Sequence, residues 1–442
     1  MKIIEAARMN RDAVAAIRAE PIDWRFKGMP AKLFGTRIAD AAAAGLDLFT
    51  DDFVGPLVVL DEPALEHNLR TMANWCRANG LALAPHGKTT MAPQLFARQL
   101  DHGAWGITAA NISQLRVYRA FGVSRVLMAN QLVDPAALRW VAAELDCDPA
   151  FSFSCFVDSV PGVARMSETL AARAASGARP LDVMVEIGGA GGRTGARGLE
   201  AAVEVAEAVM ASPVLRLVGV AGYEAALTQG TTGAADLAAV DAYLLALRNL
   251  VARLAADGHF TDLGDEPILV TAGGSAYFDQ VAAAFTQSWP SGLNVLGVLR
   301  SGCYLTHDDG VYRRLSPFGR QHRLPGGVPF RPALHAWAQV TSHPEPALAL
   351  LTMGRRDVPF DQDLPEPQFR RRAGGVTVPM FQSRVTQLND QHAFLSIEGD
   401  DRVEVGEWVR FGLSHPCTAF DKWPLLAVVN GTRVVDLVRT FF

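Results

Sequence analysis

The sequence predicts an α/β protein, a (β/α)8 TIM barrel joined to a C-terminal antiparallel β domain. Between about residues 60 and 310, eight short apolar runs alternate with Ala- and Leu-rich stretches of helical spacing. Near-continuous apolar strands that alternate with helices indicate parallel strands buried on both faces. Eight such units in roughly 250 residues fit a closed barrel. After about residue 310, Pro- and Gly-rich segments separate short alternating runs, which is typical of antiparallel strands.

The predicted barrel strands follow one another at regular intervals. They are Leu81–Pro85, Gly106–Ala109, Val126–Ala129, Phe151–Val157, Val183–Ile187, Leu217–Ala221, Ile268–Thr271 and Val295–Leu299. The helices predicted between them include Pro135–Leu145, Leu199–Met210 and Ala234–Ala256. A doubly wound open sheet is the alternative, but such a sheet usually has fewer strands.

The second domain is predicted to be discontinuous in sequence. Its strands include His335–Thr341, Ala393–Ser396, Trp408–Phe411 and Leu425–Val429. The run Leu57–Leu60 is surplus to the eight barrel strands, so we expect it to pair with the C-terminal sheet. The predicted boundaries are residues 60–310 for the barrel and residues 1–59 together with 311–442 for the β domain.

Composition excludes several classes of partner. The 442 residues include 41 basic and 46 acidic side chains, a formal charge of −5, with no Lys/Arg cluster, so neither nucleic acid nor a membrane is expected as a partner. The five cysteines are odd in number and scattered, which argues against a disulfide framework. Glu5 and Arg8 stand where a signal peptide needs an apolar core, and no run reaches the ~18 apolar residues of a membrane span. We therefore expect a cytoplasmic protein.

The first predicted strand ends at a lysine that is a candidate for covalent chemistry. In a (β/α)8 barrel, the active site lies at the carboxyl ends of the strands. Lys88 follows that end, with His86 two residues before it. Burial favours the neutral amine of a lysine, which can form a Schiff base with an aldehyde or ketone. A loop lysine at the surface is the alternative, but its position and neighbours favour the active site.

The seventh and eighth predicted strands end in small residues that suit an anion site. Gly273, Gly274 and Ser275 follow one strand, and Gly302 and Tyr304 follow the next. Glycines before a helix let backbone amides approach an anion, and these two loops are the usual phosphate site of a barrel. Tight turns alone also need glycine. A lysine opposite a phosphate site suggests a phosphate-bearing aldehyde, and pyridoxal phosphate is the obvious candidate.

Two further motifs carry weaker signals. A glycine-dense run at residues 188–195 follows the fifth strand and is expected to present Arg193 inward, although such runs arise often by chance. His415 and Cys417 are two residues apart, so an extended chain could place imidazole and thiolate on one side. Two such ligands could form an open metal site, but without further context a buried, packed pair is the simpler interpretation. The other four cysteines are expected to be packing or loop residues.

Together these motifs resemble the D-threonine aldolase/D-serine dehydratase family. The matching segments are Pro85–Thr89, Gly273–Ser275, Gly302–Tyr304 and His415–Cys417. The resemblance runs from about residue 30 to the end and implies a fold-type III pyridoxal phosphate enzyme, distantly like alanine racemase. The family also implies a homodimer. It commonly carries Arg and His at the positions that hold Ala84 and Thr90 here.

The resemblance assigns a role to each candidate residue. Lys88, with His86 beside it, looks like the catalytic lysine that also holds pyridoxal phosphate. The other cofactor-binding residues implied are Arg193, Tyr223, Gly273, Gly274, Ser275, Gly302 and Tyr304. His415 and Cys417 look like ligands of Zn²⁺, and a soft thiolate ligand agrees with zinc.

The function implied is a lyase acting on a small D-amino acid. We expect a zinc-dependent D-serine dehydratase-like ammonia-lyase, which removes water from a D-3-hydroxy amino acid and yields a 2-oxo acid and ammonia. A D-threonine-type aldolase, yielding glycine and an aldehyde, is the alternative. The resemblance favours the dehydratase, because His-x-Cys is typical of the family's dehydratases, whereas its aldolases more often carry His-x-Asp. A racemase, a pyridoxal phosphate carrier and a barrel without ligand are further alternatives.

Overall fold

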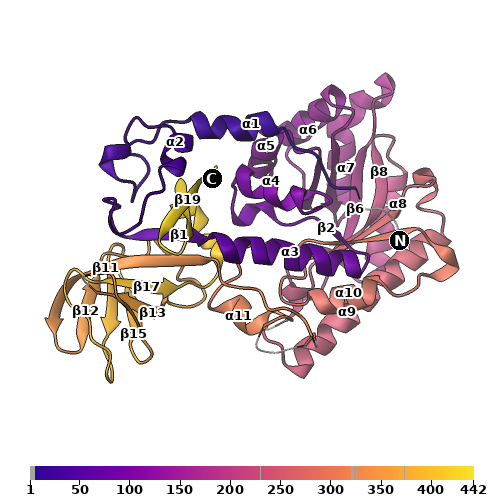
Figure 1. Ribbon diagram of the computed structural model, residues 1–442. Helices are drawn as coiled ribbons and strands as arrows, with labels where there is room; N and C mark the ends of the chain where they lie inside the picture. The colour runs from indigo at the N-terminus through magenta and orange to yellow at the C-terminus, as the bar shows by residue number, and fades with distance from the viewer. Residues whose placement is uncertain (1–4, 229, 320–322, 325, 373) are drawn as a thin grey trace.

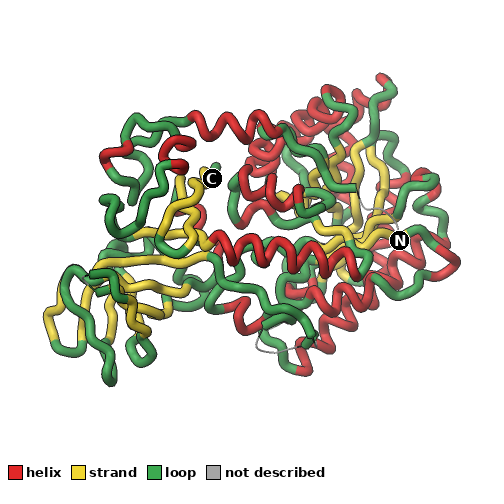
Figure 2. The backbone as a smooth tube through the Cα atoms, viewed as in Figure 1, coloured by secondary structure: helices red, strands yellow, loops and turns green. Residues whose placement is uncertain are grey.

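The computed structural model describes residues 5–228, 230–319, 323–324, 326–372 and 374–442. It contains two large sheets that lie side by side, one inside a ring of helices and one largely free of helices (Figures 1 and 2). Residues 1–4, 320–322, 325 and 373 of the predicted β domain lie outside the described residues.

The first sheet contains the eight predicted barrel strands in parallel. They are β2 (Ala82–Leu83), β3 (Ile107–Ala109), β4 (Arg125–Gln131), β5 (Ser152–Val157), β6 (Leu181–Gly188), β8 (Leu215–Gly222), β9 (Ile268–Ala272) and β10 (Val295–Leu299). Their order in the sheet is β2-β10-β9-β8-β6-β5-β4-β3, and the short β7 (Ala196–Arg197) pairs with β6. The predicted fold class is confirmed.

The two ends of this path meet, so the sheet curls into a ring. The Trp105 amide donates to the Leu83 carbonyl at 2.7 Å, and the Thr108 amide donates to the Pro85 carbonyl at 2.8 Å. A single parallel bridge pairs His86 with Thr108. The chain between β2 and Lys88 therefore forms part of the barrel wall, which fixes where the lysine emerges.

The helices begin where the sequence supplies caps. Asp61, Asn111 and Asp134 each accept a hydrogen bond from a backbone amide in the first turn of the following helix, at 2.8, 3.0 and 2.8 Å. Pro63 and Pro135 lie in the first turns of two of these helices, where a proline is tolerated. The helices are α1 (Arg11–Ala16), α2 (Ile38–Ala43), α3 (Glu62–Ala78), α4 (Pro93–Asp101), α5 (Ile112–Ala120), α6 (Pro135–Cys147), α7 (Val160–Leu170), α8 (Leu199–Met210), α9 (Ala234–Ala256), α10 (Phe278–Phe285) and α11 (Val311–Leu315).

The second sheet is mostly antiparallel and takes one strand from early in the chain. Its strands are β1 (Leu57–Asp61), β11 (Leu334–Glu345), β12 (Leu348–Leu351), β13 (Glu366–Arg371), β14 (Thr377–Pro379), β15 (Arg384–Leu388), β16 (Ala393–Ser396), β17 (Trp408–Gly412), β18 (Leu425–Asn430) and β19 (Arg433–Arg439). The path through it is β14-β13-β17-β11-β1-β18-β19. The early strand β1 lies between β11, antiparallel to it, and β18, parallel to it.

Helix α3 joins the two sheets. It begins directly after β1 and ends three residues before β2. Leu65 and Leu69, near its start, pack in the core of the β domain, whereas Met72 and Cys76, near its end, pack in the barrel core. One amphipathic helix thus holds the domains together, with α4 and the loop after β10 adding Leu95 and Leu305 to the β-domain core. In the described part of the chain, no helix is both long and apolar enough to cross a membrane.

Candidate active site

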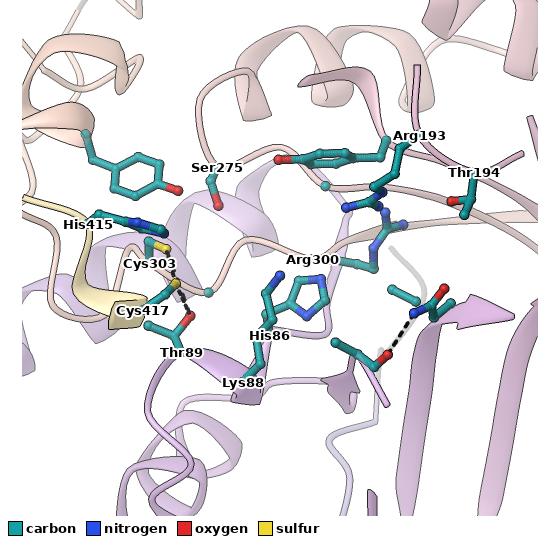
Figure 3. Close-up of a pocket in the computed structure, with 17 residues that line it drawn as sticks. His86, Lys88, Thr89, Arg193, Thr194, Ser275, Arg300, Cys303, His415 and Cys417 are labelled. Carbon is teal, nitrogen blue, oxygen red and sulfur yellow. Dashed lines mark hydrogen bonds between the residues drawn. The ribbon is translucent and has the colours of Figure 1, made fainter. Parts of the chain in front are cut away.

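A pocket lies at the carboxyl ends of the barrel strands, where a turn of the β domain approaches them (Figure 3). Its volume is about 340 Å³, which suits a small cofactor or metabolite. Nine of the predicted site residues line it: His86, Lys88, Arg193, Tyr223, Gly273, Ser275, Gly302, His415 and Cys417. The structure therefore brings residues 86 to 417 of the chain together around one cavity.

Lys88 and His86 enter the pocket from the chain after β2 (Figure 3). The backbone from Gly87 to Thr89 forms a single 3-10 turn. A Cβ atom at Gly87 would lie 2.6 Å from the Tyr118 hydroxyl oxygen, so only glycine permits this close approach. Glycine before the lysine thus lets the turn sit tightly on the barrel wall, with Lys88 half-buried at the mouth.

The lining of the pocket is cationic. Lys88, Arg193 and Arg300 all line it, and the seventeen lining residues include no carboxylate. Burial, together with these three cations, holds the pKa of His86 well below its usual range. Its imidazole is therefore neutral at physiological pH, and its buried Nδ1 atom has no hydrogen-bond partner. A pocket of this kind favours an anionic ligand, although the whole chain is acidic.

Arg300 is a functional candidate that the sequence interpretation did not select. Its guanidinium is buried and donates to the Thr271 hydroxyl at 2.7 Å and to the Gly222 carbonyl at 2.6 Å. The Nε atom has no partner. The signal was present in the sequence, since Arg300 follows the eighth strand directly, but an arginine at a strand end does not by itself reveal that it is buried.

Arg193 and Tyr223 both line the pocket, and their binding of the cofactor stays a prediction. The Arg193 guanidinium carbon lies 4.7 Å from the centroid of the Tyr223 ring, a cation–π contact. A Cβ atom at Gly273 would lie 2.6 Å from that ring, so glycine is required beneath it. Burial raises the pKa of the Tyr223 hydroxyl to about 12, which keeps this group protonated.

The predicted anion cradle needs a correction at its glycines. The Gly273 and Gly274 amides donate to the two carboxylate oxygens of Glu224, at 3.0 and 2.5 Å. Glu224 is fully buried, and burial raises the pKa of its carboxyl group. These two amides are therefore engaged by a side chain of the protein. Ser275 and Gly302 are the cradle residues that face the pocket free of this contact.

Tyr304 is the second correction, because its side chain points into the barrel core. Its hydroxyl accepts a hydrogen bond from Gln99 at 3.3 Å, and its ring packs on Phe330. The sequence placed Tyr304 at a strand end but could not show which way its ring turns. Its neighbour Cys303 faces the pocket instead.

The turn that carries His415 and Cys417 comes from the β domain, directly after β17. His415 has a left-handed backbone, with φ of 61°, and its amide donates to the buried Asp308 carboxylate at 3.0 Å. Its Nδ1 atom lies 2.5 Å from an oxygen of Asp361, whose other oxygen accepts from the Thr418 hydroxyl at 2.8 Å. The Asp361 carboxylate thus orients the ring and leaves Nε2 as the nitrogen available to a ligand.

Cys417 meets two residues of the barrel. Its sulfur lies 3.3 Å from the Thr89 hydroxyl oxygen and 3.5 Å from the sulfur of Cys303 (Figure 3). Hydrogen bonds from Cys303 and His415 hold the pKa of the Cys417 thiol well below its usual range. The pKa of the Cys303 thiol is raised by its contact with Cys417 and by burial. The hydrogen bond with Cys417 also raises the pKa of His415, to about 9.

Cys303, which was expected to be a packing or loop residue, lies in the loop after β10, but its place at the pocket was not predicted. Cys76 and Cys155 are buried and Cys147 is exposed at the end of α6. Cys303 instead lines the pocket beside Cys417. Sequence separation concealed this pairing, since the two cysteines are 114 positions apart in the chain. The residues Thr89 and Asp361 were missed for the same reason.

Comparison with protein families agrees with both parts of the structure. Residues 60–278 match the alanine racemase N-terminal domain, and residues 333–429 match the putative serine dehydratase domain. The chain is a relative of the D-threonine aldolase/D-serine dehydratase family. The resemblance predicted from its motifs is confirmed.

Individual relatives give the same result. The chain is 28% identical over 318 residues to 3-hydroxy-D-aspartate aldolase of Paracoccus denitrificans, covering 70% of this chain and 74% of the relative. It is 25% identical to D-threonine aldolase of an Arthrobacter species, covering 86% and 90%. These relatives are named as aldolases, which are lyases, as the sequence interpretation expected.

Solved structures are similar over almost the whole chain. D-threonine aldolase of Filomicrobium marinum superposes with a TM-score of 0.69 at 26% identity, covering 88% of this chain and 95% of the other. D-threo-3-hydroxyaspartate dehydratase of Delftia sp. HT23 shares the fold, with a TM-score of 0.67 at 20% identity over 88% and 98%. The cytoplasmic location and the homodimer stay predictions.

The pocket residues suit pyridoxal phosphate. An amine at Lys88, the unpartnered Nδ1 of His86 and the arginines Arg193 and Arg300 present groups that an anionic aldehyde can satisfy. The thiolate of Cys417, a soft ligand, and the imidazole of His415 are both ligand types that suit zinc. Among the described residues, no three His, Cys, Asp or Glu side chains are already arranged to hold a metal ion.

Proposed function

We propose that this protein is a lyase of D-3-hydroxy amino acids that uses pyridoxal phosphate and zinc, and that it removes water to give a 2-oxo acid and ammonia. One observation carries the proposal. Lys88, from the barrel, and the pair His415 and Cys417, from the β domain, line the same small cationic pocket. Covalent cofactor chemistry and metal chemistry would therefore act on one substrate.

Lys88 is the residue that would hold the cofactor aldehyde and then move the α-proton of the substrate. Its amine is the nucleophile in the pocket, and it is also the base best placed beside a bound amino acid. Bound pyridoxal phosphate supplies an electron sink for the charge left at the α-carbon. The neutral imidazole of His86 can accept a hydrogen bond close to Lys88.

The arginines and small residues would bind the anionic groups. Arg193 and Arg300 are the cations facing Lys88 across the pocket (Figure 3). We assign these two arginines to binding the carboxylate of the substrate and the ring of the cofactor. Ser275 and Gly302 remain as donors for a phosphate, because Glu224 already engages the amides of Gly273 and Gly274.

His415 and Cys417 would hold the zinc ion. Asp361 fixes the His415 ring through Nδ1, as carboxylates commonly do for metal-binding histidines. Zinc supplies Lewis acidity that makes the β-hydroxyl a better leaving group. Loss of water gives an enamine, which hydrolyses to the 2-oxo acid and ammonia.

Aldol cleavage is the second candidate, because the curated relatives at 25–28% identity are named as aldolases. In that reaction a base removes the proton of the β-hydroxyl, the Cα–Cβ bond breaks, and glycine and an aldehyde are released. We favour elimination because the family resemblance associates His-x-Cys with dehydratases, and the thiolate at Cys417 is a softer ligand than the carboxylate of His-x-Asp.

Product analysis tests the proposal. The purified protein, supplied with pyridoxal phosphate and zinc, is incubated with D-serine, D-threonine, D-3-phenylserine and D-3-hydroxyaspartate. We expect ammonia and the 2-oxo acid in equal amounts. Glycine and an aldehyde would instead establish the aldolase. Turnover of none of these compounds, in protein that shows the bound cofactor by its near-visible absorbance, would refute both candidates.

A further inference from the structure

A second cysteine stands at the proposed metal site. Cys303 follows β10 in the barrel, is 6% exposed and lines the pocket. Its sulfur lies 3.5 Å from that of Cys417 and 3.9 Å from the Thr89 hydroxyl oxygen. The same hydroxyl lies 3.3 Å from Cys417. Two sulfurs from different domains therefore share one polar neighbour at the edge of the pocket.

The spacing of the two sulfurs suits a shared zinc ion. A zinc–sulfur bond is about 2.3 Å long, so two thiolates at a tetrahedral angle lie roughly 3.8 Å apart. The observed separation of Cys303 and Cys417 is within a few tenths of an ångström of this value. It is much longer than the ~2.05 Å of a disulfide bond.

The third group of the cluster is already oriented for coordination. Asp361 and Thr418 form a short chain of hydrogen bonds that ends on Nδ1 of His415. The opposite ring nitrogen is thus left for a ligand on the side of Cys417, with which His415 forms a hydrogen bond. The three side chains are not yet arranged around one point, so they would have to close on an ion as it binds.

We propose that Cys303 is a third protein ligand of the zinc ion, which completes a Cys₂His set with His415 and Cys417. This inference rests on the proposed function. Each thiol releases its proton to solvent when its sulfur binds the metal. Three protein ligands leave one position of a tetrahedral zinc ion open, the usual pattern of a catalytic site. That position would take the β-hydroxyl oxygen of the substrate.

This ligand set has two consequences for the molecule. Cys303 belongs to the barrel, whereas His415 and Cys417 belong to the β domain, so the metal would tie the two domains together at the pocket. Two thiolates and a neutral imidazole also form a soft set, which selects zinc strongly over magnesium and manganese.

X-ray absorption at the zinc edge tests the assignment directly, because it counts sulfur neighbours independently of activity. In the zinc-loaded holoenzyme we expect two sulfurs at about 2.3 Å. The Cys303→Ser variant should retain one sulfur, and its zinc affinity, measured by competition with a chromogenic chelator, should fall about 100-fold or more. Cys147→Ser, at an exposed position, is the matched control and should change neither value.

Other outcomes separate the two proposals. A single sulfur in active wild-type enzyme, with unchanged affinity in Cys303→Ser, would overturn the role of Cys303 and leave the lyase intact. Zinc bound by two sulfurs in a protein that turns over no D-3-hydroxy amino acid would support this inference and refute the proposed function. Full turnover without any bound zinc would refute the metal site while leaving the pyridoxal phosphate chemistry.

Discussion

The barrel mouth and the β-domain turn meet at one pocket, but they are held in place in different ways. Lys88 and His86 emerge from the closed wall of the barrel, where strand pairing fixes the backbone. His415 and Cys417 lie on a short turn that depends on side-chain contacts with Asp308 and Asp361. Strand pairing therefore fixes the geometry of the barrel side, whereas a few polar side chains fix the geometry of the turn.

The chemistry of the two sides also differs. The barrel contributes cations, which suit an anionic cofactor and an amino-acid carboxylate. The turn contributes an imidazole and a thiolate, which suit a soft metal ion. We infer that the barrel side serves the step common to both candidate reactions, binding of the amino acid to the cofactor, whereas the turn acts on the β-hydroxyl and so influences which product forms.

The largest expected effect comes from the barrel side. Lys88→Ala should abolish the near-visible absorbance of the bound cofactor and reduce kcat about ten-thousand-fold, because both the nucleophile and the base are lost. Absorbance scans and turnover assays measure this. Lys32→Ala, at an exposed ion pair with Asp51, is the control. If both absorbance and turnover persist in the Lys88 variant, Lys88 is neither the residue that holds the cofactor nor the base.

Removing the metal side should give a smaller and separable effect. In Cys417→Ala, or after treatment with a chelator, we expect kcat to fall about 1,000-fold while the cofactor absorbance remains, since Lewis acidity contributes several kcal/mol to the barrier. Added zinc should restore the chelated wild type and not the variant. Unchanged turnover after complete removal of zinc would make the His415–Cys417 pair purely structural.

Removal of the Asp361 carboxylate should have a smaller effect than removal of a zinc ligand. Asp361→Asn removes the charge that orients His415, so zinc affinity should fall about 10- to 100-fold with little change in the cofactor absorbance. Chelator competition measures the affinity. Asp390→Asn, an exposed carboxylate of the same domain that pairs with Arg356, is the matched control. Equal effects in both variants would indicate a general disturbance of the β domain.

The smallest expected effect is a pH dependence of the folding stability, which arises at His307, between the barrel and the β domain. Burial lowers the pKa of His307 to about 3, whereas an unfolded histidine titrates near 6.5. The unfolded state therefore binds more protons between pH 6.5 and pH 3, and stability falls as the pH drops. At pH 5 the free energy of unfolding is therefore lower by about 2 kcal/mol than at neutral pH.

His307→Asn removes this titration while tolerating the left-handed backbone at that position, where φ is 47°. Urea midpoints at pH 7.5 and 5.0 should differ less in the variant than in the wild type. Parallel shifts in the two proteins would show that His307 does not carry the effect. The neighbouring histidine of the turn, His415, has a raised pKa of about 9 because it has the partners that His307 lacks.

The comparison of the two sides explains which predictions succeeded. All eight barrel strands were found at the predicted places, and Leu57–Leu60 does pair with the C-terminal sheet. Apolar periodicity is a local property, so it can be interpreted without knowing the neighbours. The position of Lys88 at the pocket was predicted by the same reasoning, because the carboxyl ends of barrel strands form the active-site face.

The errors came from contacts that periodicity does not encode. Tyr304 and Cys303 are adjacent in sequence, yet one turns into the core and the other into the pocket. The amides of Gly273 and Gly274 were expected at an anion site and are engaged by Glu224. Each of these depends on a residue distant in the chain.

The sequence by itself determined the order of strands and helices, the lysine at the end of the first strand and the pairing of His415 with Cys417 in one motif. These follow from short-range spacing, which the backbone geometry converts directly into position. Only the tertiary structure decided that Cys303 and Thr89 meet Cys417, and that Asp361 meets His415. The physical reason is that these contacts form only when the β domain docks on the barrel, and that docking is set by the packing of α3 across two cores.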